Sequence, residues 1–155
     1  VRCFDLFVTD ETVSAFRFAD YDYVIEAIDT VSGKLSIVKA CAAAKTPIVS
    51  CMGAGNKLDP TAFEVTDIYR TKVCPLAKVM RKLCRENGIE RLKVVYSREI
   101  PIAAAQSETA AKREGAYKPR VPGSVAFVPS VAGLIAAGEA VKAIAGVYGN
   151  GIDRS

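Results

Sequence analysis

The order of apolar and polar positions predicts a strand, helix, strand and loop within residues 20–60. An apolar run begins at Tyr23-Val24-Ile25 and leads to Asp29, and residues 48–52 form a short β-branched run suited to a buried parallel strand. Residues 36–44 between them are rich in alanine and favour a helix. The pattern therefore predicts a βαβ unit that ends on a carboxylate at the carboxyl end of its first strand.

The same periodicities extend the prediction along the rest of the chain. They predict further strands at residues 1–8, 63–69, 92–97 and 124–128, and helices at residues 10–16, 75–86 and 131–144. Residues 99–122 are polar and alanine-rich, which predicts a mobile loop with a helical piece around 103–111. The alternation of strands and helices indicates an α/β fold in one domain.

Composition narrows the possible chemistry. The chain has 155 residues, half of them hydrophobic, with no apolar run long enough to cross a bilayer and no signal-peptide pattern. Its five cysteines form no CxxC pair and it has no histidine, which argues against zinc and excludes a Ser-His-Asp or Cys-His centre within this chain. Cys41, Cys51 and Cys84 fall in apolar patterns, so we expect them at core positions. The odd number of cysteines favours a reducing cytoplasm. We expect no membrane partner, because no long apolar run is found.

The net charge of +4 is unevenly placed. Residues 70–98 carry nine Lys/Arg against two Asp/Glu, whereas residues 1–69 carry six against ten. On the predicted helix 75–86, Leu76, Val79, Met80 and Leu83 form an apolar stripe, and the opposite face is basic through Lys78, Arg81, Lys82 and Arg85. Such a face suits the phosphates of a nucleic acid, although a solvated helix face explains the charge equally well.

The glycine-containing loop at residues 52–56 is a poor match to a dinucleotide-binding loop. A third glycine would fall at position 58, which is leucine, and Pro60 stands where a helix should begin. We therefore expect these glycines to permit tight turns or a close backbone approach.

Four stretches together resemble one family. Residues 27–35 (AIDTVSGKL), 51–61 (CMGAGNKLDPT), 65–82 and 122–142 are similar to the ThiF/MoeB/HesA superfamily of E1-like adenylating proteins, and most of all to its tRNA threonylcarbamoyladenosine dehydratase branch (TcdA/CsdL). The resemblance implies a Rossmann-like fold with a mixed sheet and flanking helices. It also implies ATP-dependent cyclisation of N6-threonylcarbamoyladenosine at tRNA position 37 through an adenylated carboxylate.

The resemblance also implies cofactors, partners and site residues. ATP with Mg²⁺, a monovalent cation, tRNA and a homodimer are expected, and a sulfur-transfer partner stays open. Asp29 matches an aspartate beside the triphosphate and its magnesium, and Thr30 and Lys34 border the nucleotide in the AID-x-x-x-x-K pattern. From the residues alone, a helix N-cap is the favoured role of Asp29.

Cys74 is a candidate reactive thiol. It precedes a predicted helix and has Arg70, Lys72 and Lys78 near it in sequence, features that favour a thiolate. Related E1-like proteins carry a catalytic cysteine in this general region, yet cyclisation requires no thioester.

The resemblance covers only the second part of the family's domain. The phosphate loop GxGxxG, the ribose-binding acid and the phosphate-neutralising cations of the family would lie before residue 1. We therefore expect residues 1–155 to be the carboxyl-terminal portion of a longer enzyme, without its N-terminal nucleotide-binding βαβ half and inactive alone. Adenylation of a ubiquitin-like sulfur carrier, and a non-catalytic remnant that dimerises or binds tRNA, remain as alternatives.

Overall fold

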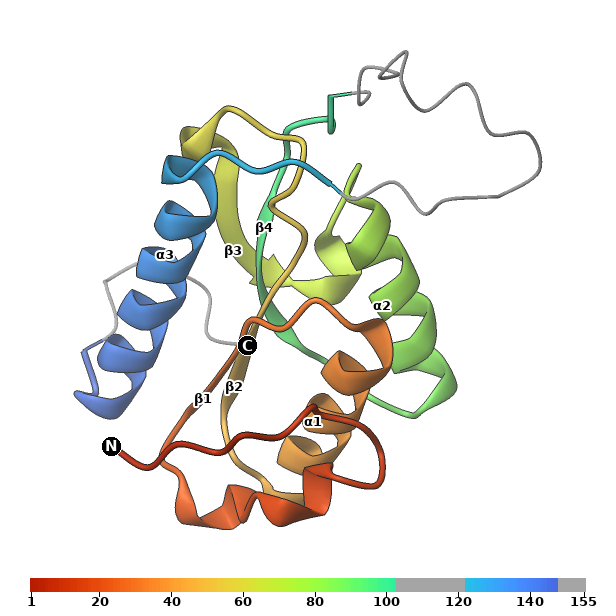
Figure 1. Cartoon of the computed structure of the whole chain (residues 1–155), viewed down its shortest axis with the longest axis vertical. Helices are drawn as coiled ribbons and strands as arrows, with labels where there is room; N and C mark the ends of the chain where they lie inside the picture. The colour runs from red at the N-terminus through yellow and green to blue at the C-terminus, as the bar shows by residue number, and fades with distance from the viewer. Residues whose placement is uncertain (103–121, 148–155) are drawn as a thin grey trace.

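The computed structural model describes residues 1–102 and 122–147, which form one layer of β-sheet between helices (Figure 1). The sheet has four strands in the order β1-β2-β4-β3. Its strands are β1 (Val24–Glu26), β2 (Ile48–Cys51), β4 (Lys93–Ser97) and β3 (Phe63–Asp67). The first three are parallel and β3 pairs antiparallel with β4 at the edge, which confirms a mixed sheet.

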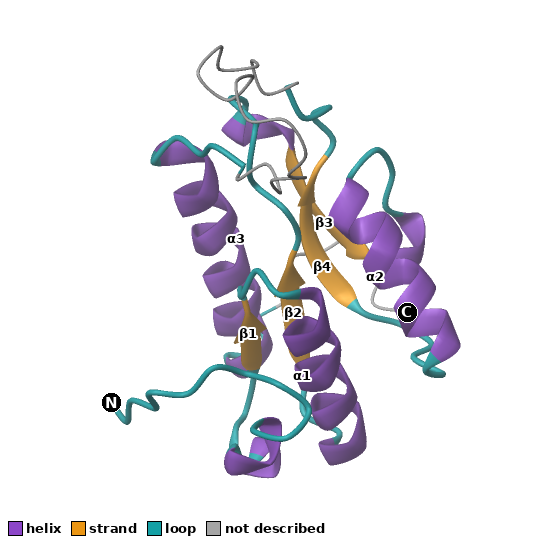
Figure 2. Cartoon of the chain, turned by 45° about the vertical axis from the view of Figure 1, so that its right-hand side comes forward, coloured by secondary structure: helices purple, strands orange, loops and turns teal. Residues whose placement is uncertain are grey.

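Helices cover both faces of this sheet. Helices α1 (Val31–Ala44) and α2 (Pro75–Glu86) lie on one face, and α3 (Phe127–Ile144) lies on the other (Figures 1 and 2). Four short 3-10 turns complete the described structure: η1 (Val13–Ala15), η2 (Phe18–Asp20), η3 (Pro60–Ala62) and η4 (Ile68–Arg70). The predicted βαβ unit is confirmed as β1-α1-β2, with α1 beginning five residues earlier than predicted.

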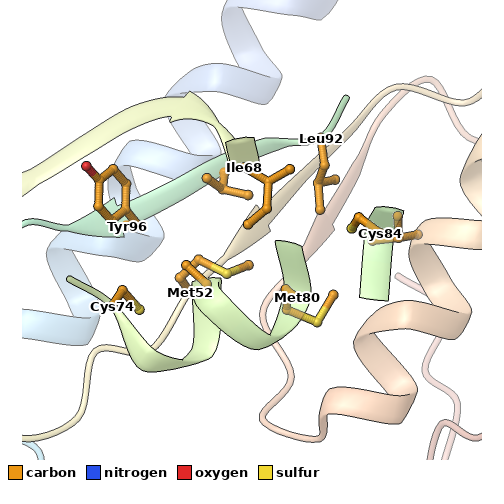
Figure 3. Close-up of a cluster of buried hydrophobic side chains, with 10 residues drawn as sticks. Met52, Ile68, Cys74, Met80, Cys84, Leu92 and Tyr96 are labelled. Atoms are coloured by element: carbon orange, nitrogen blue, oxygen red, sulfur yellow. The ribbon is translucent and has the colours of Figure 1, made fainter. Parts of the chain in front are cut away.

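The two cores are built from alternate residues of the central strands. On β4, Val94 and Tyr96 enter the cluster beneath α1 and α2 (Figure 3). Val95, between them, packs with Val49 and Ala136 beneath α3. Strands buried on both faces explain the continuous apolar runs in the sequence.

The packing of α2 corrects the predicted apolar stripe. Ala77, Met80 and Cys84 face the core, at a spacing of three and four residues. Val79 was placed in the stripe, but its side chain points outward and is 45% exposed. The prediction was wrong at this position because it counted a large apolar residue and passed over the small Ala77.

Two predicted strands are absent from the described residues. Residues 1–8 run without regular structure, and Leu6 and Phe7 are exposed, because no described strand lies beside them to complete a ladder. The predicted helix at residues 10–16 is only the 3-10 turn η1.

The second missing strand is the one predicted at residues 124–128. Helix α3 already begins at Phe127, and Pro129 occupies its first turn, where an absent N–H breaks no helical bond. The predicted helical piece at 103–111 and most of the predicted loop 99–122 lie outside the described residues.

The glycine loop connects distant parts of the chain. A Cβ on Gly55 would lie 2.6 Å from Cβ of Pro122, so only glycine permits this approach. Next to it, the Asn56 amide donates to the Gly123 carbonyl at 2.7 Å, and the Gly123 amide donates to Asn56 Oδ1 at 2.9 Å. The loop thus joins the end of β2 to the segment that leads into α3, as the close-approach interpretation expected.

Candidate functional site

A crevice of about 150 Å³ lies at the carboxyl ends of β1 and β2. Open α/β sheets bind their ligands outside this edge of the strands. Its walls come from the loop after β1, the loop after β2 and the first turns of three helices; the lining residues are Ala27, Ile28, Asp29, Lys34, Cys51, Met52, Gly53, Ala54, Leu76, Pro129, Ala132 and Gly133. Its volume is below the ~300–1,000 Å³ of pockets that enclose a whole small ligand, so it suits one part of a larger one.

Asp29 presents a free carboxylate to this crevice. Its side chain is exposed and makes no hydrogen bond or ion pair with any residue of the described segments 1–102 and 122–147. The N-cap position of α1 belongs to Thr30, whose side chain makes no capping bond. The interpretation of Asp29 as a helix N-cap is therefore wrong, and its carboxylate is available to a ligand.

The helices make the crevice electropositive. Lys34 in the first turn of α1, Leu76 in that of α2, and Pro129 and Gly133 near the start of α3 all line it. Each helix N-terminus carries partial positive charge from its unpaired amide groups. Three such ends beside one carboxylate favour an anionic group bridged to Asp29 by a cation, and magnesium often uses one or two carboxylates together with phosphate oxygens.

Lys34 lines the crevice, but its ammonium group is fully engaged. Its side chain is 1% exposed, and Nζ donates to Glu26 Oε1 at 2.9 Å, to Glu26 Oε2 at 3.0 Å and to the Cys51 carbonyl at 2.7 Å. An ammonium has three protons to donate. The expected contact between Lys34 and a nucleotide therefore stays a prediction. In the present arrangement Lys34 has no free N–H group with which to make it.

The partners of Lys34 were not identified from the sequence. Glu26 is 2% exposed at the end of β1, accepts the Ile28 amide at 2.8 Å and also accepts a hydrogen bond from Ser50 Oγ on β2. One signal was available, because an acidic residue inside an apolar strand requires a buried partner. Lys34, eight residues later at the start of the helix, was the nearest cation.

Cys74 occupies the N-cap position of α2 but is buried. Its side chain is 4% exposed and belongs to the cluster that contains Met52 and Tyr96 (Figure 3). Lys57 is equally buried, and burial lowers the pKa of its ammonium while Cys74 and Glu99 act weakly in the opposite direction. The reactive thiol stays a prediction, and reaction would require this cluster to open.

The basic face of α2 divides into free and engaged cations. Lys78, Lys82 and Arg85 are exposed. Lys82 forms an exposed ion pair with Glu86 at 3.7 Å, and the Arg85 guanidinium lies 5.3 Å from the ring centre of Tyr69. Arg81 is half-buried, and its Nη1 donates to the Thr71 carbonyl at 2.8 Å and to Thr71 Oγ1 at 2.6 Å. Arg81 thus fixes the segment before α2, and the other three form the outward basic face.

The fold and the crevice define an open α/β protein with its candidate ligand site at the carboxyl edge of the sheet. The profile of the ThiF family matches residues 1–154, and the chain belongs to this family.

Relatives with curated names point to one branch. The tRNA threonylcarbamoyladenosine dehydratase of Bacillus subtilis is 42% identical over an alignment of 143 residues, which covers 88% of this chain and 56% of the relative. The enzyme of the same name from Escherichia coli is 40% identical over 82 residues, covering 53% of this chain and 31% of the relative. The chain therefore spans about half the length, or less, of these relatives.

Solved structures agree with these relatives. The E. coli tRNA N6-threonylcarbamoyladenosine dehydratase in complex with AMP superposes with a TM-score of 0.74 and 30% identity, over 92% of this chain and 56% of that one. Its complex with ATP gives a TM-score of 0.75 and 29% identity over the same shares. The predicted family and α/β fold class are confirmed.

Thiol reactivity should follow burial. Burial raises the pKa of the Cys41 and Cys84 thiols to about 11, which leaves roughly one thiol in a thousand ionised at pH 8. We expect iodoacetamide at pH 8 to modify the exposed Cys3 in the folded protein, and Cys41, Cys74 and Cys84 only after unfolding. Peptide mass spectrometry over time measures each rate, and modification of Cys74 as fast as Cys3 would contradict its burial.

Proposed function

We propose that a protein containing this chain catalyses the ATP-dependent dehydration of N6-threonylcarbamoyladenosine at tRNA position 37, closing the side chain to a cyclic product. The observation that carries the proposal is the Asp29 carboxylate, unpartnered among the described residues, at a crevice of a chain that superposes on a dehydratase solved with ATP. The curated relatives share that name, which favours tRNA over a sulfur-carrier protein as the substrate. All five cysteines are free thiols, consistent with a reducing cytoplasm.

In this proposal the substrate carboxylate attacks the α-phosphorus of ATP and releases pyrophosphate. The carbamoyl group of the same side chain then attacks the acyl carbon, displaces AMP and closes the ring. Asp29 would hold Mg²⁺, since a carboxylate oxygen is a hard ligand suited to that ion. The first turns of the three helices would stabilise the phosphate oxygens through their partial positive charge. Thr30 and the side chain of Lys34, which lines the crevice, would border the nucleotide.

The crevice supplies only part of such a site. Among the described residues that line it, Lys34 is the single cation, and its protons are already used. Adenylation requires positive charge near the phosphates of ATP, where negative charge develops on the α-phosphate and on the leaving pyrophosphate. We propose that the remaining length found in the relatives supplies these groups, and that the 155 residues alone do not turn over ATP.

Replacing Asp29 by Asn tests the role of this carboxylate. In a chimera where residues 1–155 replace the matching segment of the B. subtilis relative, we expect Asp29→Asn to lower Mg-ATP turnover on modified tRNA at least about tenfold, since a metal contact contributes several kcal/mol. Asp22→Asn is the matched control, because Asp22 is exposed and does not line the crevice. Equal turnover in both variants would remove Asp29 from the site.

We further propose that the outward basic face of α2 binds tRNA. Lys78, Lys82 and Arg85 are exposed on one helix. Such cations suit contact with the phosphates of a nucleic acid, which positions the protein but does not read the base sequence. Arg81 would support this face indirectly by fixing the segment before the helix.

Charge reversal tests this surface on the chain itself. We expect Lys78→Glu/Lys82→Glu to weaken tRNA binding at least about tenfold and to reduce the slope of log affinity against log salt by about two, one for each lost phosphate contact. Fluorescence anisotropy at several salt concentrations measures both. Lys39→Glu/Lys45→Glu changes the net charge equally on exposed sites of α1 and its end. Equal loss in both variants would mean that only overall charge matters.

The outer side of α3 supports the expected homodimer. Positions spaced alternately by three and four residues are all exposed and mostly apolar: Phe127, Ser130, Leu134, Ala137, Val141 and Ile144. This is the spacing of a two-helix seam, and the nearby Glu139 is already paired with Lys93 and Lys142. The prediction that no apolar run is long enough to cross a bilayer is wrong for α3, which by length and composition could cross a membrane, although core helices of globular proteins pass the same test. We propose that a second copy of the chain covers this seam.

Analytical ultracentrifugation tests the seam. We expect the protein to dimerise and Leu134→Lys to weaken dimerisation at least about tenfold, because a charge would be buried at the centre of the interface. Val79→Lys places the same charge on an exposed apolar site of α2 and should leave the dimer intact. A monomer at all concentrations, or partition of the protein into lipid vesicles, would overturn the proposal.

A further inference from the structure

One buried ion pair, between Lys34 and Glu26, lies at the wall of the crevice. Lys34 and Glu26 have side chains that are 1% and 0% exposed, whereas every other ion pair among residues 1–102 and 122–147 has a partner at least 38% exposed. A buried charge is retained in a protein only when its partner and hydrogen bonds satisfy it. The hydrogen bonds around Glu26 and Lys34 are therefore needed to keep this pair buried.

Those contacts reach three segments at the edge of the sheet. Lys34 belongs to the first turn of α1 and reaches the Cys51 carbonyl at the end of β2. Glu26, at the end of β1, holds the Ile28 amide and the Ser50 hydroxyl. Ile28 directly precedes Asp29, so the pair joins the Asp29 segment to β2 and to α1.

The backbone around the pair leaves little freedom. A Cβ on Gly33 would lie 2.7 Å from Thr30 Oγ1 and 2.8 Å from both Ile28 Cδ1 and the Val8 carbonyl oxygen. The first turn of α1 therefore packs closely against the segment that carries Asp29. Movement of Lys34 would move that segment with it.

We propose that Glu26 and Lys34 are positioning residues that hold Asp29 and the end of β2 at the crevice, and that Lys34 acts through Glu26 and Cys51 and not by contact with the ligand. The proposal rests on the proposed function for its catalytic meaning. The three donors of the Lys34 ammonium are all used, so a ligand contact would have to break this arrangement.

Amide hydrogen exchange in the 155-residue chain tests the positioning role directly. The double variant Glu26→Leu/Lys34→Met removes both charges together, so no unpaired charge is left buried. We expect the Ile28 amide to exchange about tenfold faster, because its bond to a carboxylate is lost. The Ile68 amide, which bonds to the Leu92 carbonyl at 2.8 Å, should exchange as before.

A second ion pair provides the matched control. Lys93→Met/Glu139→Leu removes a pair on β4 and α3 and should leave Ile28 exchange unchanged. Should the first double variant not fold, Glu26→Gln/Lys34→Met keeps the shape at position 26, leaves no buried charge and replaces the carboxylate acceptor of the Ile28 amide by a neutral amide oxygen, with about threefold faster exchange expected. A folded Glu26 variant with exchange of Ile28 at the wild-type rate would overturn the proposal, as would equal acceleration at Ile68.

Kinetics separates this proposal from the proposed function. In the B. subtilis chimera, the Glu26→Leu/Lys34→Met variant should raise KM for Mg-ATP about tenfold with a smaller change in kcat, since a misplaced ligand weakens binding. An unchanged KM would overturn the positioning role in catalysis. If the unmodified chimera shows no turnover on modified tRNA, the proposed function fails, whereas the exchange result in the chain still decides whether the pair holds the Asp29 segment.

Discussion

The buried Glu26–Lys34 ion pair is the constraint on which the carboxyl edge of the sheet depends. Two charges removed from water are costly, and the cost is offset only by close pairing and complete hydrogen bonding. Here Glu26 accepts from Lys34, Ile28 and Ser50, and Lys34 also reaches the Cys51 carbonyl. The end of β1, the end of β2 and the start of α1 are consequently held in one relative arrangement.

This pairing also decides which charge is left at the crevice. Because Glu26 neutralises Lys34, Asp29 has no cationic partner among the described residues and remains a free carboxylate. Its negative charge faces the positive ends of three helices. This arrangement of opposite charges is the reason why we propose a cation between Asp29 and a bound anion.

The sequence predicted the elements whose signals are local. Periodicity located β1-α1-β2, β3, α2 and β4, because their buried faces impose a regular spacing. It failed at residues 1–8 and 124–128, where strand-like residues have no described neighbouring strand to pair with. It placed Asp29 at the sheet edge but missed Glu26 as the partner of Lys34, since this pairing depends on the distance between a strand end and a helix start.

The size and charge of the crevice together define what the chain can contribute. With about 150 Å³ it is too small to enclose a whole nucleotide, and among the described residues it offers one free carboxylate and a lysine whose protons are used. The base, the ribose and the remaining phosphate charge of a nucleotide need further groups. The match covers 92% of this chain but 56% of the solved relatives in complex with AMP and ATP, so those relatives are about 1.6 times as long. These limits of the crevice are the physical basis of our proposal that the remaining length of the relatives completes the site.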